Sequence, residues 1–458
     1  MKRYRSIALA LLALDVAASI VVFNLVTYLR QIPFWGHGIV TPLLAPAFVI
    51  VLAIYLIDGY KARTDMLSAD YASQHAIALL SAMVVTLIIT YVFIPEGYPL
   101  QSSRLVIVLS FLTLIPATLI YRRLIHLRVL ASREVQSIIF LGSRSSCEEF
   151  RAECQEMGIT QRVIFSVVDS SSARPLPGGT EADLQPFALM LERLKNRQLS
   201  VEAIILRETA GELAPEVSRQ LVDLYFAGVP TYTLELFHQI YWRKIPLYRL
   251  NQTWLFQEGF QIAREPFFDR LKRISDIVFS IFGLLLGAPV VALAGLAVWL
   301  EDRGPVFFTQ TRVGKNHAPF RVFKLRTMRT APGEGNRYTQ PGDARITRVG
   351  RFLRAARLDE LPQLWNVLRG DMSLIGPRAE WDRLVEEYER QIPCYHFRHL
   401  VKPGITGWAQ VNYHYGASLE DTLRKLEFDC YYIRHFSFML DAAIILKTIH
   451  IMLFGKGR

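Results

Sequence analysis

Long apolar stretches near the N-terminus constrain the fold of this chain more than any other feature. Four of them occur within the first 121 residues, at 7–29, 39–57, 76–94 and 105–121, with lengths of 23, 19, 19 and 17 residues. About 20 helical residues cross a hydrocarbon layer ~30 Å thick. The first stretch is too long for a signal peptide and lacks a small-residue cleavage site. We therefore predict a four-helix transmembrane bundle over residues 1–131.

Basic residues orient this predicted bundle. They precede the first stretch, follow the second and follow the fourth, whereas the other two loops are poor in lysine and arginine. Because such residues collect on the cytoplasmic side, both ends of the bundle are expected in the cytoplasm. Asp15 and Asn24 lie within the first stretch. Intramembrane polar residues can mark function, but pairing inside the bundle is the favoured interpretation.

Residues 132–262 have a different pattern, in which short β-rich runs alternate with helical ones. Runs 135–141, 163–168, 201–206 and 229–234 favour strands, and runs 147–157, 184–197 and 215–227 favour helices. This alternation predicts a parallel sheet in a Rossmann-like α/β module. The first turn, from Gly142 to Ser146, lacks the full GxGxxG fingerprint. A structural, regulatory or dimerising role is therefore favoured over a nucleotide site.

A fifth apolar block, from Ile277 to Leu300, has 24 residues without a charge. Basic residues flank it on both sides. A helix that spanned the membrane would place one of these two flanks on the side away from the cytoplasm, against the tendency of basic residues to stay inside. Pro289 lies in its middle and is expected to kink a helix. We predict a re-entrant membrane helix at about 274–300, with a kinked spanning helix as the alternative, within a mainly helical catalytic domain at 263–458.

Positive charge is concentrated just after this block. The net charge of the whole chain is +11, and the window from Arg303 to Arg357 supplies as much, with 13 Lys+Arg against two acids. Anionic ligands are therefore expected there. Neither a helix-turn-helix nor a stacking platform is present, so nucleic acid is not an expected partner. The four cysteines have no zinc-like spacing, and His396, His399 and His414 are interpreted as solvated or interfacial rather than metal-ligating.

The richest motif is the acidic pair Asp359–Glu360, which Pro362 follows closely and Gly370 more distantly. Pro362 favours the start of a helix and Gly370 favours its end, which places the two carboxylates at a partly positive helix N-terminus. Capping with surface ion pairs is the alternative role. A row of arginines at every third residue precedes the pair: Arg345, Arg348, Arg351, Arg354 and Arg357. Arginine matches phosphate oxygens, although the row could also lie on anionic lipid. Carboxylates among such cations stay ionised and suit a nucleophile that attacks phosphorus.

Four motifs in order resemble the bacterial sugar transferases, the monotopic polyprenyl-phosphate sugar-1-phosphate transferases. They are 323–328 (FKLRTM), 358–364 (LDELPQL), 374–378 (LIGPR) and 402–412 (KPGITGWAQVN). The resemblance covers about Phe267 to Phe454. The bundle and the α/β module resemble the large members, typified by undecaprenyl-phosphate galactose or glucose phosphotransferases.

The resemblance implies a ping-pong reaction on the cytoplasmic face, which initiates synthesis of O-antigen, capsule or exopolysaccharide. Asp359 matches the family nucleophile, which attacks a UDP-sugar, releases UMP and forms an aspartyl phosphosugar. Undecaprenyl phosphate then accepts the sugar phosphate. Glu360 matches the partner of the nucleophile, with Mg²⁺ coordination by Asp359 and Glu360 or proton transfer as its role.

Further residues match the family or are candidates for phosphate or substrate binding. These are Lys324, Arg326, Arg345, Arg354, Arg378, Asp429 and Asp441. For Arg378 a structural salt bridge is the alternative. Gly404 and Gly407 are expected either to admit a ligand close to the backbone or to form a plain tight loop. The run 442–454, with Lys447 and His450, is expected to lie on the membrane as an amphipathic helix.

One departure from the family is clear, because Ala288 precedes Pro289 where a serine is expected in small members. A homodimer is plausible. A non-catalytic membrane scaffold or nucleotide sensor is the alternative function, and the acidic pair with Lys324 argues against it. The resemblance also implies a location in the bacterial inner membrane, with the catalytic domain on the cytoplasmic face.

Overall fold

The computed structural model describes most of the chain. The described residues are 2–31, 41–61, 64, 66–67, 69–94, 99–133, 136–157, 162–167, 184–196, 199–207, 215–247, 266–329, 343, 345–413, 416 and 418–454. The predicted domain boundary at 262/263 and His414 lie outside them. The chain divides into two compact units, Met1–Leu124 with Trp254–Arg458, and Ile125–Thr253.

The N-terminal apolar segments form helices α1 (Lys2–Leu29), α2 (Leu44–Leu56), α3 (Ala69–Ile88) and α4 (Arg104–Arg133). A π-helical turn, Ile89–Phe93, continues α3, and 3₁₀ turns precede α2 (Thr41–Leu43) and α4 (Pro99–Ser102). Among the described helices, α1, α3 with its π turn, α4 and the later helix α10 (Pro266–Asp302) are long and apolar enough to cross a membrane.

Helix α2 differs from the predicted full span over 39–57. It has 13 residues, which corresponds to about 20 Å of helix. The preceding residues Thr41–Leu43 form a 3₁₀ turn that contains Pro42, and residues 39 and 40 lie outside the described ones. The prediction of a fourth full-length N-terminal helix is therefore not matched by the length of α2.

Asp15 forms a buried polar cluster with residues from the other helices and loops of the N-terminal segment. Its carboxylate pairs with Arg122 of α4, and both side chains are fully buried. The hydroxyls of Tyr60 and Tyr121 also donate to Asp15, and Arg122 donates to the backbone carbonyl of Gly59. The favoured interpretation of Asp15, pairing inside the bundle, is confirmed.

The unit Ile125–Thr253 contains a five-stranded parallel sheet with the strand order β3-β2-β1-β4-β5. The strands are β1 (Gln136–Gly142), β2 (Val163–Val167), β3 (Leu184–Pro186), β4 (Ser200–Leu206) and β5 (Thr231–Thr233). The predicted parallel sheet is confirmed. The prediction of one helix over 184–197 is wrong at its start, because residues 184–186 pair with β2 as an edge strand. An edge strand tolerates Pro186, which has no backbone N–H to donate.

Alternating side chains of the central strand β1 face two different helical layers. Phe140 stacks on Phe150 of α5 (Arg144–Glu156), whose ring also contacts Phe237 of α8 (Leu234–Phe237). Ile139 instead belongs to a core with α6 (Phe187–Lys195) and α7 (Pro215–Phe226). A short π turn, His238–Trp242, follows α8 and adds Trp242 to the first core. The sheet is therefore covered on both faces, as a parallel sheet requires.

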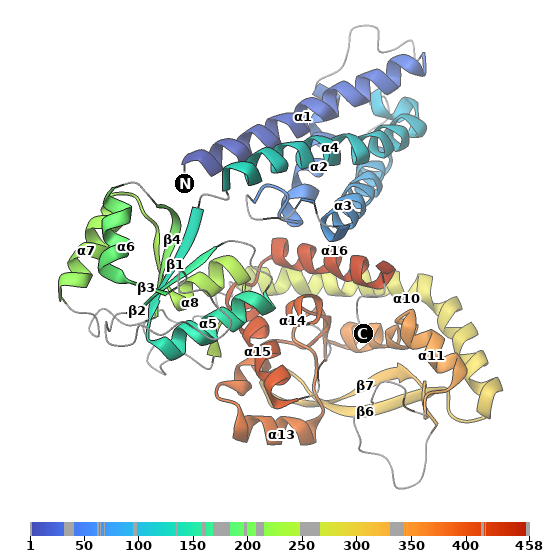
Figure 1. The fold of residues 1–458 in the computed structure, drawn as a ribbon. Coiled ribbons are helices and arrows are strands. Elements are labelled where there is room, and N and C mark those ends of the chain that lie inside the picture. Colours follow the sequence, from blue (N-terminus) through green and yellow to red (C-terminus); the bar gives the residue numbers. More distant parts are fainter. Residues whose placement is uncertain are drawn as a thin grey trace. The chain divides into compact units, whose positions relative to one another are not determined.

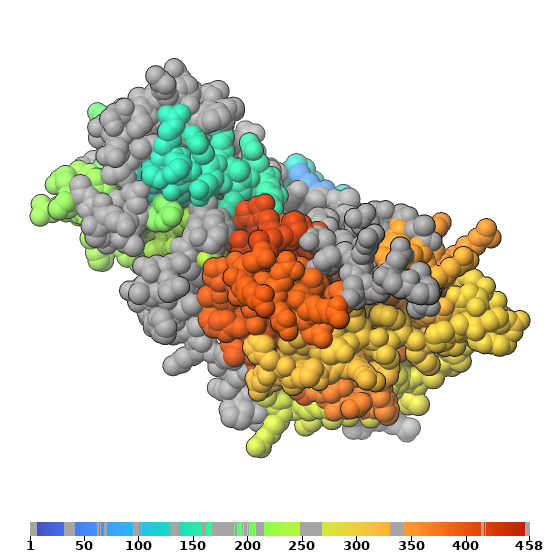
Figure 2. All heavy atoms as spheres, turned by 90° about the horizontal axis from the view of Figure 1, so that it is seen from below, coloured from blue at the N-terminus to red at the C-terminus, as the bar shows by residue number. Residues whose placement is uncertain are grey.

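The C-terminal segment carries the predicted chemical motifs. After α10 come the antiparallel strands β6 (Phe307–Val313) and β7 (Pro319–Leu325), joined through the 3₁₀ turn η8 (Lys315–His317). Then follow α11 (Arg348–Ala355), η9 (Leu358–Glu360), α12 (Gln363–Arg369), β8 (Ser373–Ile375), α13 (Asp382–Gln391), η10 (Tyr395–Leu400), β9 (Gly404–Thr406), α14 (Trp408–Asn412), α15 (Leu419–Arg434) and α16 (Phe438–Phe454). Figure 2 shows one face of this segment, on which the β6–β7 region (gold) adjoins the α13–η10 region (deeper orange).

Helix α10 is one element of 37 residues with Pro289 inside it, and it bends along its length in Figure 1. Proline removes a backbone donor and clashes with the preceding turn, which accounts for a bend. Much of its apolar surface is exposed, including Phe282, Leu285 and Leu293. Such a surface is typical of a helix in contact with lipid.

Both ends of α10 are held by the C-terminal segment. Near its start, Arg273 donates to the carbonyls of Val367 (2.5 Å) and Leu368 (2.7 Å) at the end of α12. Near its end, the carboxylate of Glu301 accepts from the backbone N–H groups of Arg348 (2.8 Å) and Val349 (3.1 Å) at the start of α11. Both ends of this helix therefore contact the same C-terminal segment.

Candidate active site

The acidic pair lies in a tight turn between two helices. Arg357 adopts a left-handed conformation (φ 59°, ψ 18°) and precedes the 3₁₀ turn Leu358–Glu360. Pro362 then caps α12, and Gly370 (φ 98°) ends it in the left-handed region. The predicted helix start and end are thus found at Pro362 and Gly370. The carboxylates belong to the turn just before the helix, at the positive end of its dipole, which favours negative charge.

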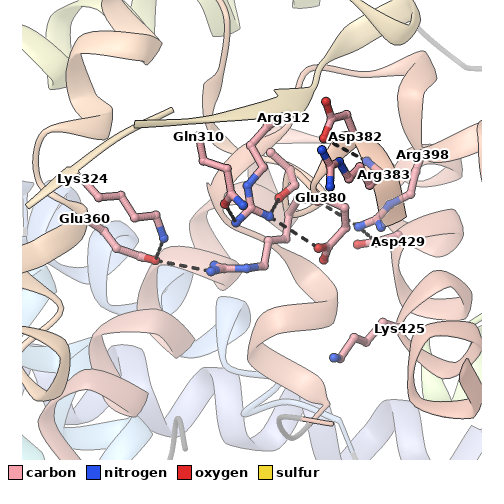
Figure 3. A network of polar contacts seen from close by, with 12 residues as sticks. Gln310, Arg312, Lys324, Glu360, Glu380, Asp382, Arg383, Arg398, Lys425 and Asp429 are labelled. Atoms are coloured by element: carbon pink, nitrogen blue, oxygen red, sulfur yellow. Dashed lines mark hydrogen bonds and ion pairs between the residues drawn. The ribbon is translucent and has the colours of Figure 1, made fainter. Parts of the chain in front are cut away.

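Glu360 lies between two cations from different elements. Lys324 Nζ on β7 is 2.8 Å from Glu360 Oε1, and Arg378 Nη2 is 3.5 Å from the same oxygen. Figure 3 shows the Lys324 and Glu360 side chains pointing toward each other. The Arg378 side chain remains 38% exposed, against 18% for Lys324 and 12% for Glu360. The cluster is therefore open to the surface on the Arg378 side.

Asn366 fixes the strand that carries Lys324 against the helix that follows Glu360. Its side chain is fully buried and donates to the Arg321 carbonyl (2.7 Å) while it accepts from the Phe323 N–H (3.1 Å). Both contacts are to the backbone of β7, so they set the position of the strand without using the side chains that face the site. A buried amide satisfied in this way is a rigid connection.

The two carboxylates have opposite pKa shifts. Burial raises the pKa of Glu360, but Lys324, Arg378 and Arg357 outweigh it, and the pKa falls to about 2. For Asp359, burial and the neighbouring Glu360 raise the pKa, and Lys324 and Arg354 oppose the rise only in part. Burial and Arg378 lower the pKa of Lys324, against the attraction of Glu360. Glu360 is thus a fixed anion, whereas Asp359 is the more basic and more readily protonated carboxylate.

Asp359 is buried, with 8% of its surface exposed. Its own backbone N–H is the only hydrogen-bond donor to its carboxylate among the residues that the structure describes. A carboxylate that is ionised, held near cations and short of donors has lone pairs available for reaction or for a ligand. This is the chemical property that distinguishes Asp359 from Glu360.

The turn with the acidic pair rests on α10. A Cβ atom at Gly283 would lie 2.9 Å from Leu364 Cδ1, and one at Gly287 would lie 3.8 Å from Leu361 Cδ1. Gly283 therefore makes room for the start of α12, whereas a methyl group at Gly287 would meet Leu361 at an ordinary contact distance. The turn with the acidic pair thus packs against the apolar helix α10.

Two of the predicted phosphate-binding residues are paired with acids away from Glu360. Arg326 makes a two-oxygen contact with Asp302 and also donates to the Pro305 carbonyl. Arg345 contacts Asp343, two residues before it in sequence, at 2.7 Å. Arg354 differs from both, because it lies close enough to act on the charge of Asp359. The structure therefore brings Lys324, Arg354 and Arg378 to the acidic pair, and gives Arg326 and Arg345 other partners.

The two later aspartates are also engaged elsewhere. Asp429 pairs with the buried Arg398 at 3.0 Å, and burial raises the pKa of Asp429 to about 6 against the effect of Arg398. Asp441 pairs with Lys272 of α10 and accepts from the Tyr432 hydroxyl (2.8 Å). Both aspartates fasten helices of this segment together.

The glycine-rich motifs pack against each other. A Cβ atom at Gly404 would lie 2.1 Å from the Gly376 nitrogen, and one at Gly407 would lie 2.1 Å from the Gly376 oxygen. Backbone therefore fills the space beside these glycines, in agreement with the tight-loop interpretation. The pairing of β8 with β9 places Arg378 next to the loop, through a bridge between Arg378 and Gly404.

Arg312, Gln310 and Glu380 form a second polar group that the motifs did not single out. Arg312 donates to Gln310 Oε1 (2.7 Å) and to the Ala379 carbonyl (3.1 Å), and lies 3.6 Å from Glu380. Figure 3 shows this group beside the Lys324–Glu360 pair. The only signal in the sequence is that Arg312 belongs to the basic window after the fifth apolar block.

Two further predictions concern the surroundings of Lys447 and His450 on α16 and of His399. Lys447 of α16 donates to Asn412 Oδ1 (2.7 Å) and lies over the Trp408 ring, and His450 is buried. Lys447 and His450 thus face protein, and the position of α16 on the membrane stays a prediction. His399 is buried as well, so the solvated position, one of the two predicted for it, is wrong, and the interfacial position is not tested.

Comparison with known proteins matches residues 267–455 to the family described as bacterial sugar transferase. The UDP-glucose:undecaprenyl-phosphate glucose-1-phosphate transferase of Caulobacter vibrioides is 45% identical over 184 residues, which are 40% of this chain and 69% of that protein. The enzyme of the same name from Escherichia coli is 45% identical over 183 residues, 39% of each chain.

A longer match joins this chain to an Aeromonas hydrophila protein, a UDP-N-acetylgalactosamine-undecaprenyl-phosphate N-acetylgalactosaminephosphotransferase. The two are 39% identical over 257 residues, 56% of this chain and 60% of that protein. The aligned part thus spans 60% of the Aeromonas protein and 39% of the E. coli protein. The relatives differ in the sugar that their names give.

Proposed function

This chain belongs to the bacterial sugar transferase family, and we propose that it transfers a sugar 1-phosphate from a UDP-sugar to undecaprenyl phosphate. The observation that carries the proposal is the acidic pair itself, with an available, more basic Asp359 beside a Glu360 neutralised by Lys324 and Arg378. A diphosphate substrate and a phosphate acceptor both need such cations. In this role the protein would initiate a cell-surface polysaccharide such as O-antigen, capsule or exopolysaccharide.

In the first step, an oxygen of the Asp359 carboxylate forms a bond to the β-phosphorus of the UDP-sugar. The bond from this phosphorus to the bridging oxygen breaks, and UMP leaves with the electron pair. Lys324, Arg354 and Arg378 stabilise the negative charge that spreads over the phosphoryl oxygens. The product on the protein is an aspartyl phosphosugar.

In the second step, a phosphate oxygen of undecaprenyl phosphate forms a bond to the same phosphorus. The bond to the Asp359 oxygen breaks, which restores the carboxylate and yields undecaprenyl-diphospho-sugar. One diphosphate replaces another, so the exchange needs no further energy source. Glu360 keeps Lys324 and Arg378 in place throughout, because its low pKa holds it ionised.

The carboxylates of Asp359 and Glu360 also suit Mg²⁺, which is bound in proteins through one or two carboxylates plus substrate phosphates. The fit rests on the carboxylate oxygens that are available to an ion. Among the described residues no other side chain donates a hydrogen bond to Asp359, whereas Lys324 and Arg378 already contact Glu360 Oε1. When bound, the ion would neutralise charge on the diphosphate. Asp359 is therefore the principal ligand that we propose, with Glu360 as the second.

We further propose that α10 re-enters the membrane and leaves on the cytoplasmic face of the inner membrane. Contacts of both its ends with α11 and α12 support this topology, because a straight span would separate those ends by the thickness of the membrane. The exposed apolar residues of α10 would then lie in lipid beneath the acidic pair. This arrangement would bring a lipid-linked phosphate to Asp359 without withdrawing its chain from the membrane.

The first experiment measures UMP release from a panel of UDP-sugars by the detergent-solubilised full chain with Mg²⁺ and undecaprenyl phosphate. Release with one sugar identifies the donor, and Asp359→Asn should abolish it. Asp382→Asn is the matched control, because Asp382 lies at the start of α13 and contacts only its neighbour Arg383 in the bonds observed. Absence of release with every UDP-sugar would favour the non-catalytic scaffold or sensor.

A second experiment isolates the covalent step. Without undecaprenyl phosphate, the ping-pong route predicts exchange of labelled UMP into the UDP-sugar and a gain of one sugar phosphate in the intact mass. If UMP appears only when the acceptor is present and no exchange occurs, direct transfer within a ternary complex replaces the covalent route.

The topology of α10 is tested by single cysteines at Arg270 and Arg303 in a chain otherwise free of cysteine. Re-entry predicts that an impermeant maleimide added to spheroplasts labels neither position until the cells are broken. Labelling of one position from outside would establish a spanning helix. Homodimerisation stays a prediction, which the mass of the detergent-solubilised protein would test.

A further inference from the structure

A cluster of two histidines and one glutamate lies outside the acidic pair and its cations. His317 Nε2, in the turn between β6 and β7, is 2.8 Å from Glu389 Oε1 on α13. His399 Nε2, on η10, is 4.0 Å from the same oxygen. The possible ligand atoms of all three residues lie within 4.8 Å of one another. Three separate elements therefore contribute to one small group of nitrogen and oxygen donors.

The state of His399 points to a ligand. Its side chain is 5% exposed, and its Nε2 is buried without a hydrogen-bond partner in the part of the chain that the structure describes. This nitrogen lies 4.0 Å from Glu389 Oε1, so it faces the other residues of the cluster. A buried ring nitrogen without a protein partner is available to bind an ion.

The surrounding structure holds the three elements together. The backbone N–H of Val313 donates to the Glu380 carbonyl (3.1 Å), which fixes the start of α13 beside β6. The Tyr395 ring packs between Tyr388 of α13 and His399, at centroid distances of 5.4 and 6.0 Å. His399 and Glu389 thus stand on packed elements, and His317, whose side chain is 50% exposed, can adjust.

We propose that His317, Glu389 and His399 form a zinc site with a fourth position open to water. Two imidazole nitrogens and one carboxylate oxygen are a known ligand set for Zn²⁺, and imidazole does not suit Mg²⁺. Tetrahedral zinc places its ligand atoms about 3.4 Å apart, from bond lengths of about 2.0–2.1 Å. The observed separations bracket this value, so small rotations of the exposed His317 and Glu389 side chains complete the site. The site fastens the β6–β7 turn to α13 and η10 and does not depend on the proposed transfer reaction.

The test measures Zn²⁺ binding by the full chain in detergent, by competition with a chromophoric chelator. The protein carries no polyhistidine tag, because a tag binds the same ion. We expect one Zn²⁺ per chain, unaffected by millimolar Mg²⁺, with affinity reduced by at least ~10–100-fold in His317→Ala and in Glu389→Gln. His396→Ala is the matched control, since His396 is an exposed histidine of the same η10 turn outside the cluster.

Two further readouts keep the proposal falsifiable. Co²⁺ in place of Zn²⁺ should give the strong visible absorption of a tetrahedral site in the wild type and in His396→Ala, and lose it in His317→Ala. Zn²⁺ should also raise the melting temperature of the wild type but not that of His317→Ala, whose exposed side chain is not needed for folding. Equal zinc affinity in the wild type, His317→Ala and Glu389→Gln would overturn the proposal.

Discussion

Two clusters of buried charge in this chain look alike in composition and differ in completeness. In the N-terminal segment, Asp15 and Arg122 are fully buried, and the Asp15 oxygens also accept from Tyr60 and Tyr121. At the acidic pair, Glu360 and Lys324 are partly exposed, and Arg378 is more so. The first cluster satisfies its carboxylate with protein donors, whereas the second has cations in excess and a second carboxylate, Asp359, that is short of donors.

The closed cluster is therefore expected to stabilise the fold, and the open cluster to take part in function. A closed network in a low-dielectric interior holds helices in place, and removing one member leaves an uncompensated charge. An open cluster with surplus positive charge costs stability unless an anion binds. The two clusters should therefore respond in opposite ways to substitution.

The largest effect is expected for Asp359→Asn. The transfer rate should fall by at least ~10³-fold, the loss typical of a removed nucleophile. The melting temperature should not fall, because the raised pKa of Asp359 means that its ionised form opposes folding above the ordinary pKa, and asparagine is neutral. Measurement of UMP release and thermal unfolding on the same sample checks both parts, and a large drop in melting temperature would contradict the comparison.

Arg122→Leu should have the opposite effect. It leaves the Asp15 carboxylate buried without its cation, which we expect to destabilise the fold by about 3–5 kcal/mol. The rate per folded molecule should stay near that of the wild type. Unfolding by SDS in mixed micelles measures the loss of stability.

The double variant Asp15→Leu with Arg122→Leu provides the control for that measurement. Because no buried charge remains, it should recover most of the lost stability. If the double variant were as unstable as Arg122→Leu, the packing of the arginine side chain would be the dominant contribution, and charge pairing would not be.

The comparison also shows what the residues alone could predict. The apolar runs and the alternation of strands with helices follow from local pattern, and the structure contains both, with α2 shorter than predicted. Lys324 was expected near the acidic pair from the resemblance to the family, and its contact with Glu360 agrees with that expectation. Arg326, which looked like a phosphate ligand, contacts Asp302, and Asp429 contacts Arg398 31 residues away. A charged residue that faces an acid from another element has the same local sequence as one that faces a ligand, so only the folded chain distinguishes them.

The histidines illustrate the same limit. No spacing in the sequence joins His399 to other ligands, which favoured a solvated or interfacial position. Its two neighbours in the cluster, His317 and Glu389, come from other elements. Burial of His399 depends on packing by Tyr395 and on the turn at Gly314. Neither is visible as a periodicity in the sequence.

A smaller effect is expected for Lys324→Met. Loss of one cation should reduce the rate by about 10²–10³-fold. It should also raise the pKa of Asp359, because Lys324 lowers that pKa in the wild type. Since Asp359 reacts ionised, activity falls as pH falls through its pKa, and the acid limb of kcat/KM should move to higher pH.

Glu360→Gln should shift the acid limb of the same pH profile in the opposite direction. The negative charge of Glu360 raises the pKa of Asp359, so the amide should move the acid limb to lower pH. Shifts of the two profiles in the same direction would mean that the limb does not report Asp359.

The smallest effect concerns the contact between α10 and the turn with the acidic pair. Alanine at either Gly283 or Gly287 should favour the helix by roughly 0.5–1 kcal/mol. At Gly283, however, the new Cβ would lie 2.9 Å from Leu364 Cδ1, against 3.8 Å from Leu361 at Gly287. Gly283→Ala should therefore lower kcat by about 10-fold through displacement of the start of α12, since small misplacements of reacting groups are costly. Gly287→Ala should leave kcat unchanged. Equal rates for the two variants would show that the acidic pair tolerates movement of α12, and would restrict the role of α10 to membrane attachment.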